Sequence, residues 1–267
     1  MASVALLALL PGALLPPDYA VHADTSHMPP LPGGRRLRLL CAPDTSTAGL
    51  GGRLWDASSE LCAWQLSVAN QIRGKRLLEL GSGATGACGI FAAGLGASRV
   101  VLTDGGNEAL MRLLEWNAHA ANEEDGPENI HVAPLRWGET AIPSSTLDES
   151  ADEGFDWIVA SDVTYDSDFH APLCDSLREA LSCGNEGVRA VLCEVHGPPA
   201  PLESASELYT DEFLTAFAET AATRGLTLTP FERRPEGAET VLEPAAWPMA
   251  AFANGDAYLV EVRLATQ

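Results

Sequence analysis

Residues 75–104 read KRLLELGSGATGACGIFAAGLGASRVVLTD, and this stretch decides the fold. The apolar run at 77–80 predicts a buried strand, because it is too short for an independent helix. The glycines that follow predict a sharp turn where the backbone can approach a ligand closely. The small apolar residues at 86–95 favour a helix packed on a sheet, and 99–102 predicts a second buried strand before Asp104.

The glycine turn fits more than one kind of site. Gly81, Gly83 and Gly86 spell G-x-G-x-x-G, the dinucleotide fingerprint. Asp104 follows at about the expected distance along the chain, where it can accept hydrogen bonds from ribose hydroxyls. Glu79 also completes E-x-G-x-G with the first two glycines, the motif of S-adenosylmethionine-dependent methyltransferases. A turn that only packs a helix on a strand is the third interpretation.

The rest of the chain alternates between predicted strands and helices, which indicates a doubly wound, mostly parallel sheet. A helix of about four turns is expected within 51–72, capped by Asp56 or Ser58. Before it, residues 36–41 suggest one strand of a small N-terminal hairpin. The other predicted strands are 130–135, 155–160, 188–194, 226–231 and 257–264, the other helices 107–122, 170–183 and 206–224, and the loops 139–154 and 232–250.

Composition limits the partner and the compartment. The net charge of −21 is the reverse of what nucleic-acid binding needs, and it favours solubility and a basic partner. None of the 6 cysteines forms C-x-x-C or pairs with histidine at metal-ligand spacing, so we expect no metal and a reducing compartment. Residues 1–20 contain no basic residue and their apolar run breaks at Pro11, so we expect neither secretion nor a membrane span.

Several motifs together resemble one family. In chain order they are G-x-x-x-W at 51–55, LLELGSG, TD ending at Asp104, WNAHAAN, LRWGE and FDWIVASDVTY. The combination is similar to the seven-strand S-adenosylmethionine-dependent protein methyltransferases, specifically the lysine methyltransferases of family 16 with a D-x-x-Y motif. The resemblance implies an α/β fold, a doubly wound seven-strand Rossmann-like sheet with helices on both faces. It places the methyltransferase domain at 51–267, after a short N-terminal extension at 1–50.

The resemblance also implies roles for single residues. Asp162 and Tyr165 would be the catalytic D-x-x-Y pair that shapes the methyl-acceptor site. The residues implied to bind the cofactor are Glu79, Gly81 and Gly83 at its methionine end, Asp104 at the ribose, Trp137 at the adenine, Trp55 near the substrate entrance, and Ser161. The sequence departs from the family at GSGATG, where Ala84 is an insertion or Thr85 replaces a glycine. The departure leaves the role of Gly86 open.

The activity implied by the resemblance is methyl transfer from S-adenosylmethionine to a protein side chain, most readily a lysine. Val163 and Thr164 replace the two prolines of the related N/D-P-P-Y/F motif, which marks enzymes that methylate amide or nucleobase nitrogens. A protein substrate of basic character is therefore expected, together with a monomer in the cytoplasm or the nucleus. Two alternatives stay open: a nicotinamide-dependent oxidoreductase that uses G-x-G-x-x-G, and a non-catalytic interaction protein that keeps the fold.

Overall fold

The central strand of the molecule is β3 (Arg76–Leu80), which leads into the glycine turn. The computed structural model describes residues 16–125, 129–139, 141–142, 154–195, 212–233, 239–241 and 258–265. In them, β3 belongs to a sheet ordered β5-β4-β3-β6-β7-β10-β8-β9. The other strands of the sheet are β4 (Arg99–Asp104), β5 (Ile130–Pro134), β6 (Trp157–Ser161), β7 (Arg189–Glu194), β8 (Leu226–Arg233), β9 (Glu239–Val241) and β10 (Tyr258–Leu264).

The strand order has a point of reversal beside β3. The chain moves outward from β3 to β4 and β5, then returns to place β6 on the other side of β3. Strands β3 to β7 are parallel in each pairing, whereas β10 lies antiparallel between β7 and β8. This topology confirms the predicted doubly wound sheet of seven strands. Ligands in such sheets bind at the carboxyl ends of the strands where the order reverses.

Strand β9 is an eighth strand that the sequence analysis did not foresee. It pairs antiparallel with the end of β8, within residues 232–250, which were predicted to be a loop. That prediction is wrong at 232–233 and at 239–241. The physical reason is that β8 would otherwise offer a row of unpaired backbone groups at the edge of the sheet, and a neighbouring segment satisfies them.

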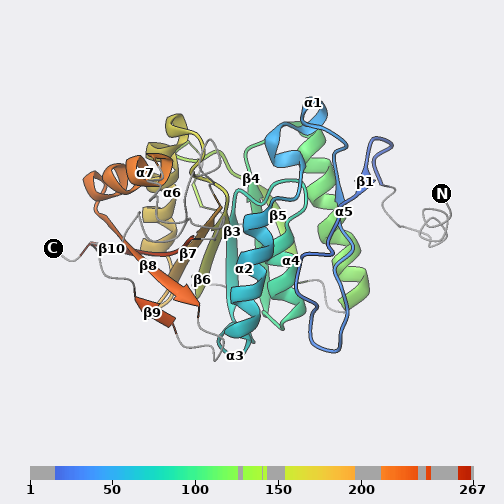
Figure 1. The fold of residues 1–267 in the computed structure, drawn as a ribbon, viewed down its shortest axis with the longest axis horizontal. Helices are drawn as coiled ribbons and strands as arrows, with labels where there is room; N and C mark the ends of the chain where they lie inside the picture. Colours follow the sequence, from blue (N-terminus) through green and yellow to red (C-terminus); the bar gives the residue numbers. More distant parts are fainter. Residues whose placement is uncertain are drawn as a thin grey trace, which may run out of the picture.

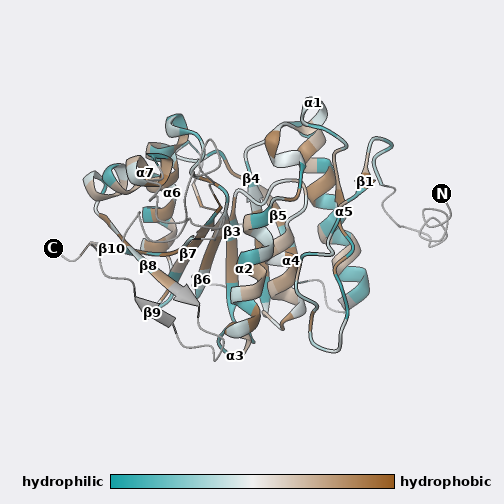
Figure 2. Ribbon diagram, in the orientation of Figure 1, coloured by the Kyte–Doolittle hydropathy of each residue, from teal (hydrophilic) through white to brown (hydrophobic). Residues whose placement is uncertain are grey.

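Helices cover both faces of the sheet, as predicted (Figure 1). The first face carries α2 (Asp56–Ser67), α4 (Ala87–Gly94) and α5 (Glu108–Asp125), and the second carries α6 (His170–Ser182) and α7 (Glu212–Thr223). The alternation of side chains along β3 explains both layers, since Leu77 packs into the first core and Leu78 and Leu80 into the second. Helix α5 carries both hydrophobic and hydrophilic residues along its length (Figure 2).

The helix predicted within 51–72 differs from expectation in two ways. Helix α2 begins at Asp56 itself, and Trp55 occupies the N-cap position without a side-chain hydrogen bond. The predicted cap at Asp56 or Ser58 is therefore wrong, although Asp56 in the first turn still favours the positive end of the helix dipole. The helix also breaks at Val68, where the backbone leaves the helical conformation before the short α3 (Ala69–Ile72).

The remaining predicted elements are found within a few residues of their expected positions. Helix α5 begins one residue after Asn107, whose side chain accepts a hydrogen bond from the amide of Leu110. Residues 206–211 of the last predicted helix, and 140 and 143–153 of the predicted acidic loop, lie outside the described residues. Among the helices that are described, none has both the length and the apolar character that crossing a membrane requires.

The N-terminal segment packs on α5 through one buried side chain. The strand predicted at 36–41 is present only at β2 (Leu40–Cys41), which pairs antiparallel with β1 (Val21–His22) in a small two-stranded sheet. The prediction of a strand is therefore wrong at 36–39. Asn117 of α5 bonds both backbone groups of Leu40 at 2.8 Å, and it donates a further bond of 2.8 Å to the carbonyl of Ala84. Asn117 is 1% exposed. One amide therefore joins the N-terminal segment, α5 and the glycine turn.

Replacing Asn117 by alanine should lower the free energy of unfolding by about 3 kcal/mol, because buried backbone groups of Leu40 and Ala84 lose their partner. Urea denaturation measures the change. The matched control is Glu123→Ala in the same helix, at a more exposed position, which should stay within about 0.5 kcal/mol of the parent protein. Equal stabilities for the two variants would contradict the role given to Asn117.

Candidate functional site

The turn between β3 and α4 needs residues without a Cβ at three positions. Gly81, Gly83 and Gly86 all have positive φ, at 67°, 58° and 55°. A Cβ on Gly81 would lie 2.9 Å from the Trp137 ring, and one on Gly83 would lie 2.7 Å from the carbonyl oxygen of Gly51. The turn thus passes close to its neighbours with its backbone, which is the form of a loop that receives a ligand.

The unusual GSGATG sequence has a structural explanation. Ala84 is fully buried, its amide donates to the carbonyl of Gly51 at 2.7 Å, and its carbonyl accepts from Asn117. Gly86 adopts the left-handed conformation immediately before α4, so it reverses the chain into the helix. Ala84 therefore docks the turn onto Gly51, and Gly86 has a conformational role.

Asp104, at the end of β4, faces the turn. Its Oδ2 accepts a bond of 2.9 Å from the amide of Gly83, and its Oδ1 accepts one of 2.7 Å from the amide of Gly106. Burial raises the pKa of this carboxyl, and the backbone bonds oppose the increase. Each carboxylate oxygen can accept more than one hydrogen bond, so capacity remains for the donors of a ligand.

Glu79 lies beneath the turn rather than at its surface. It is 2% exposed, and its Oε2 accepts a bond of 2.9 Å from the amide of Gly89 in α4. Burial raises the pKa of Glu79 to about 7, although hydrogen bonds from Gly89, Ser82 and Cys88 lower it. The carboxyl is thus held between β3 and the start of α4, with a proton affinity far above that of an exposed glutamate.

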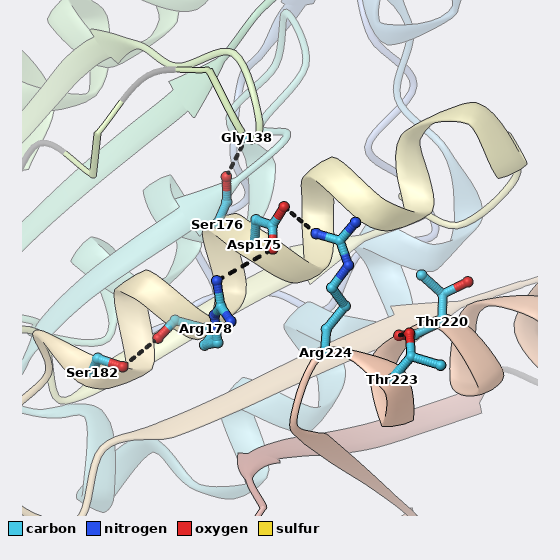
Figure 3. Close-up of polar contacts among 8 residues, drawn as sticks. All are labelled: Gly138, Asp175, Ser176, Arg178, Ser182, Thr220, Thr223 and Arg224. Carbon is cyan, nitrogen blue, oxygen red and sulfur yellow. Dashed lines mark hydrogen bonds and ion pairs between the residues drawn. The ribbon is translucent and has the colours of Figure 1, made fainter.

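Trp137 is held against the turn from the other side. Its ring would contact a Cβ on Gly81, and it meets the ring of Phe169 edge-on at 6.2 Å. The next residue, Gly138, donates its amide to the Ser176 hydroxyl of α6 at 3.1 Å, as Figure 3 shows. Helix α6 therefore fixes the turn that carries Trp137.

Helix α6 is in turn tied to α7. Arg224 after α7 forms an ion pair with Asp175, which also faces Arg178 one turn along α6 (Figure 3). A polar depression of about 570 Å³ lies between α6 and the residues after Trp137. It is lined by Gly138, Glu139, Ala141, Asp175, Arg178, Glu179 and Ser182. None of the predicted site residues lines it, so we do not assign it to the cofactor.

The predicted acceptor pair follows β6 on the same edge of the sheet. Asp162 has a φ of 54°, and no other non-glycine residue among those described has a positive φ. Tyr165 is 42% exposed. The pKa of its hydroxyl is raised, mainly because the hydroxyl is partly buried and to a lesser extent because of the negative charges of Asp104 and Asp162. Val163, between Asp162 and Tyr165, lies against the glycine turn, since a Cβ on Gly81 would stand 3.0 Å from its Cγ1. The cofactor and acceptor candidates therefore lie next to one another.

The two remaining candidates lie at the margin of this site. Ser161 is the last residue of β6, and its hydroxyl lies 3.0 Å from the Ser58 hydroxyl of α2. Trp55 is 40% exposed, and its indole N–H donates to the carbonyl of Leu50 at 3.1 Å. Trp55 is thus connected to the turn through the 50–52 segment, whereas Ser161 lies at the reversal of strand order. Their predicted roles in cofactor binding stay predictions.

Sequence reasoning missed two residues of this site. Gly51 holds the turn through its carbonyl oxygen, a contact that no local pattern signals. Glu194 ends β7, is fully buried, and accepts bonds from the backbone amides of Val163 and Thr164. An acid at the carboxyl end of a buried strand was the signal that singled out Asp104, and the same signal would have found Glu194.

Comparisons with known proteins give a consistent result. The sequence profile of a family described as lysine methyltransferase matches residues 36–195. The chain is 33% identical over 148 residues to the protein N-lysine methyltransferase METTL21A of Danio rerio, covering 55% of this chain and 63% of that protein. It is 31% identical over 156 residues to the protein N-terminal and lysine N-methyltransferase efm7 of Emericella nidulans, covering 55% and 59%.

A third relative is the calmodulin-lysine N-methyltransferase of Arabidopsis thaliana, 31% identical over 127 residues, covering 48% of this chain and 40% of that protein. The matches to these relatives therefore span less than two thirds of the relatives' own lengths. None of them is a nicotinamide-dependent enzyme by name, so the oxidoreductase alternative loses its support.

Glu79 should make stability fall as pH rises. Its pKa is 4.5 in the unfolded chain and about 7 in the fold, so between these values only the folded state keeps the proton. The stabilisation is complete below pH 4.5 and is lost as pH passes 7, by on the order of 3 kcal/mol. Urea unfolding should show the parent protein losing stability relative to Glu79→Gln, whose neutral amide does not titrate, as pH rises from about 5 to 8. A difference that is constant over this range would contradict the prediction.

Proposed function

The chain belongs to the lysine methyltransferase family, and from that premise we propose that it transfers a methyl group from S-adenosylmethionine to a lysine side chain of a protein. One observation carries the proposal. The glycine turn with Asp104 and the D-x-x-Y corner with Tyr165 follow the neighbouring strands β3, β4 and β6, and Val163 of the corner lies against Gly81 of the turn. A methyl donor and an acceptor must meet in one site.

The residues at the turn fit the cofactor. Gly81 and Gly83 give the turn its tight shape beside Trp137 and Gly51, and the remaining acceptor capacity of Asp104 suits two ribose hydroxyls. The Trp137 ring offers a flat apolar surface for the adenine, Ser161 would serve the methionine end, and Glu79 would support that end from beneath the turn. When bound, S-adenosylmethionine supplies a methyl group on a positively charged sulfur. The protein has only to align the groups and exclude water.

Asp162 and Tyr165 would position the acceptor. A lysine amine has a pKa of about 10.4 in solution and must lose its proton to water before it attacks. Asp162 can orient the amine through a hydrogen bond, but its charge also stabilises the ammonium form, so we give it no role as a strong base. Tyr165 supplies an aromatic wall and a hydroxyl that stays protonated at neutral pH.

The rim of this site favours a basic protein segment. The corner and the residues after it carry Asp162, Asp166 and Asp168 and no basic residue within 162–168, in a chain of net charge −21. Exposed apolar side chains, among them Leu50, Trp55, Tyr165 and Phe169, accompany these charges. Charge complementarity would steer a lysine-bearing segment to the acceptor corner. Calmodulin and EEF1A appear in the names of related methyltransferases, which supports a protein substrate.

We place this activity in the cytoplasm or nucleus and assign it to a monomer. All six cysteines are free thiols, which suits a reducing compartment. Incubation of the purified chain with methyl-labelled S-adenosylmethionine and a cell lysate, followed by sequencing of labelled bands, tests the activity and identifies the substrate. Label on lysine supports the proposal. A folded protein that binds the cofactor and labels nothing would instead be the non-catalytic alternative.

Asp104→Ala should reduce S-adenosylmethionine binding by at least about ten-fold, because the ribose hydroxyls lose their charged acceptor. Isothermal titration calorimetry measures the affinity. Asp156→Ala is the matched control, since Asp156 also accepts a backbone bond, from the amide of Arg76, but lies at the opposite edge of the sheet. If Asp104→Ala binds as tightly as the control, the cofactor lies elsewhere.

Tyr165→Ala should keep cofactor affinity within about two-fold and lower kcat by about 100-fold, because the acceptor loses its wall. Tyr165→Phe separates the ring from the hydroxyl and should retain more activity than alanine. The control is Leu264→Ala, a similarly exposed apolar residue at the far end of β10. Full turnover by Tyr165→Ala would remove this residue from the acceptor site.

A further inference from the structure

We propose that Glu194 is a positioning residue, which holds the acceptor corner at residues 162–165 in its working shape through the backbone. This inference rests on the proposed function, since it concerns the residues that would receive the lysine. It extends that function, because Glu194 itself contacts neither substrate nor cofactor in the proposed arrangement. The carboxylate acts on Asp162 and Tyr165 through the peptide units between them.

The geometry of Glu194 suits this role. It is the last residue of β7 and is fully buried. Its Oε1 accepts a bond of 3.2 Å from the amide of Val163, and its Oε2 accepts one of 3.3 Å from the amide of Thr164. One carboxylate thus receives two successive backbone N–H groups, and both amides lie between Asp162 and Tyr165.

Two further bonds hold the same corner from its ends. The amide of Asp162 donates to the carbonyl of Cys193 at 2.9 Å, next to Glu194 on β7. On the other side, the Thr164 carbonyl lies 2.7 Å from Nε2 of His170, the first residue of α6. A carbonyl can only accept, so this nitrogen must carry the proton. His170 is buried and meets the ring of Phe217 edge-on at 5.4 Å, which fixes its plane.

The corner needs such support because its backbone is strained. Asp162 has a φ of 54°, a left-handed conformation that typically costs a non-glycine residue on the order of 1 kcal/mol or more. Tyr165 is 42% exposed, so packing around its side chain holds it less firmly than a core residue is held. The peptide units at 163 and 164 therefore decide where Asp162 and Tyr165 point.

A carboxylate suits this function better than a neutral amide of the same size. Both of its oxygens accept, one from the amide of Val163 and the other from the amide of Thr164. In Glu194→Gln, one oxygen is replaced by an NH₂ group that would face a backbone N–H, so one bond is lost and two donors oppose each other. The variant therefore loosens the corner while keeping the shape of the core.

The test compares Glu194→Gln with Glu261→Gln. Glu261 is also a buried glutamate, on the neighbouring strand β10, and it bonds Arg189 and Arg263 rather than the corner. Glu194→Gln should lower kcat by at least about ten-fold and leave S-adenosylhomocysteine affinity within about two-fold. Its amides at 163 and 164 should exchange with solvent faster than those of the parent protein, whereas Glu261→Gln should leave both readouts unchanged.

A second variant guards against loss of folding. His170→Phe keeps a ring against Phe217 but cannot donate to the Thr164 carbonyl, so it should show the same fall in kcat with unchanged cofactor affinity. The proposal is overturned if Glu194→Gln keeps kcat within about two-fold, or if it loses kcat and cofactor affinity together. Absence of methyl transfer by the parent protein would overturn the proposed function instead. In that case amide exchange at 163 and 164 is the remaining test of the positioning role, and unchanged exchange in Glu194→Gln overturns that role.

Discussion

The hydrogen bond from the Gly83 amide to the Asp104 carboxylate is the contact on which the proposed site depends. It joins the turn after β3 to the end of the neighbouring strand β4. Because β6 lies on the other side of β3, this contact sits beside the reversal of strand order, where parallel sheets leave room for a ligand. One bond therefore fixes the turn and orients the Asp104 carboxylate. The acceptor corner at 162–165 lies at the end of β6, the strand on the other side of β3.

The turn is supported from outside the sheet as well. The carbonyl of Gly51 accepts from Ala84, and Asn117 bonds Ala84 and Leu40 together. These contacts bring the N-terminal segment, α5 and the cofactor turn into one hydrogen-bonded unit. The acceptor corner has a comparable frame in Glu194, Cys193 and His170. Both halves of the site are thus shaped through backbone bonds to buried polar groups, which leaves the outward-facing side chains available for ligands.

The sequence was sufficient for the features that depend on local pattern. Leu77, Leu78 and Leu80 predicted the buried strand, the glycines predicted the turn, and motif order predicted the topology. Contacts between segments far apart in the chain could not be predicted from it. Strand β9 is defined by its pairing with the edge of β8, and Trp55 occupies the N-cap position of α2 although it makes no capping bond. The bonds of Gly51, Asn117 and Glu194 join residues far apart in the chain, and no periodicity records them. The domain boundary at residue 50 stays a prediction.

The central claim is that the turn at 81–86 and the corner at 162–165 enclose one site for a methyl donor and its acceptor. A crystal structure of the protein with S-adenosylhomocysteine tests it most directly. The account predicts ribose hydroxyls within hydrogen-bonding distance of Asp104, the adenine beside Trp137, and the sulfur turned towards Asp162 and Tyr165. A ligand bound at another surface, or a sulfur that faces away from the corner with protein between them, would contradict the account.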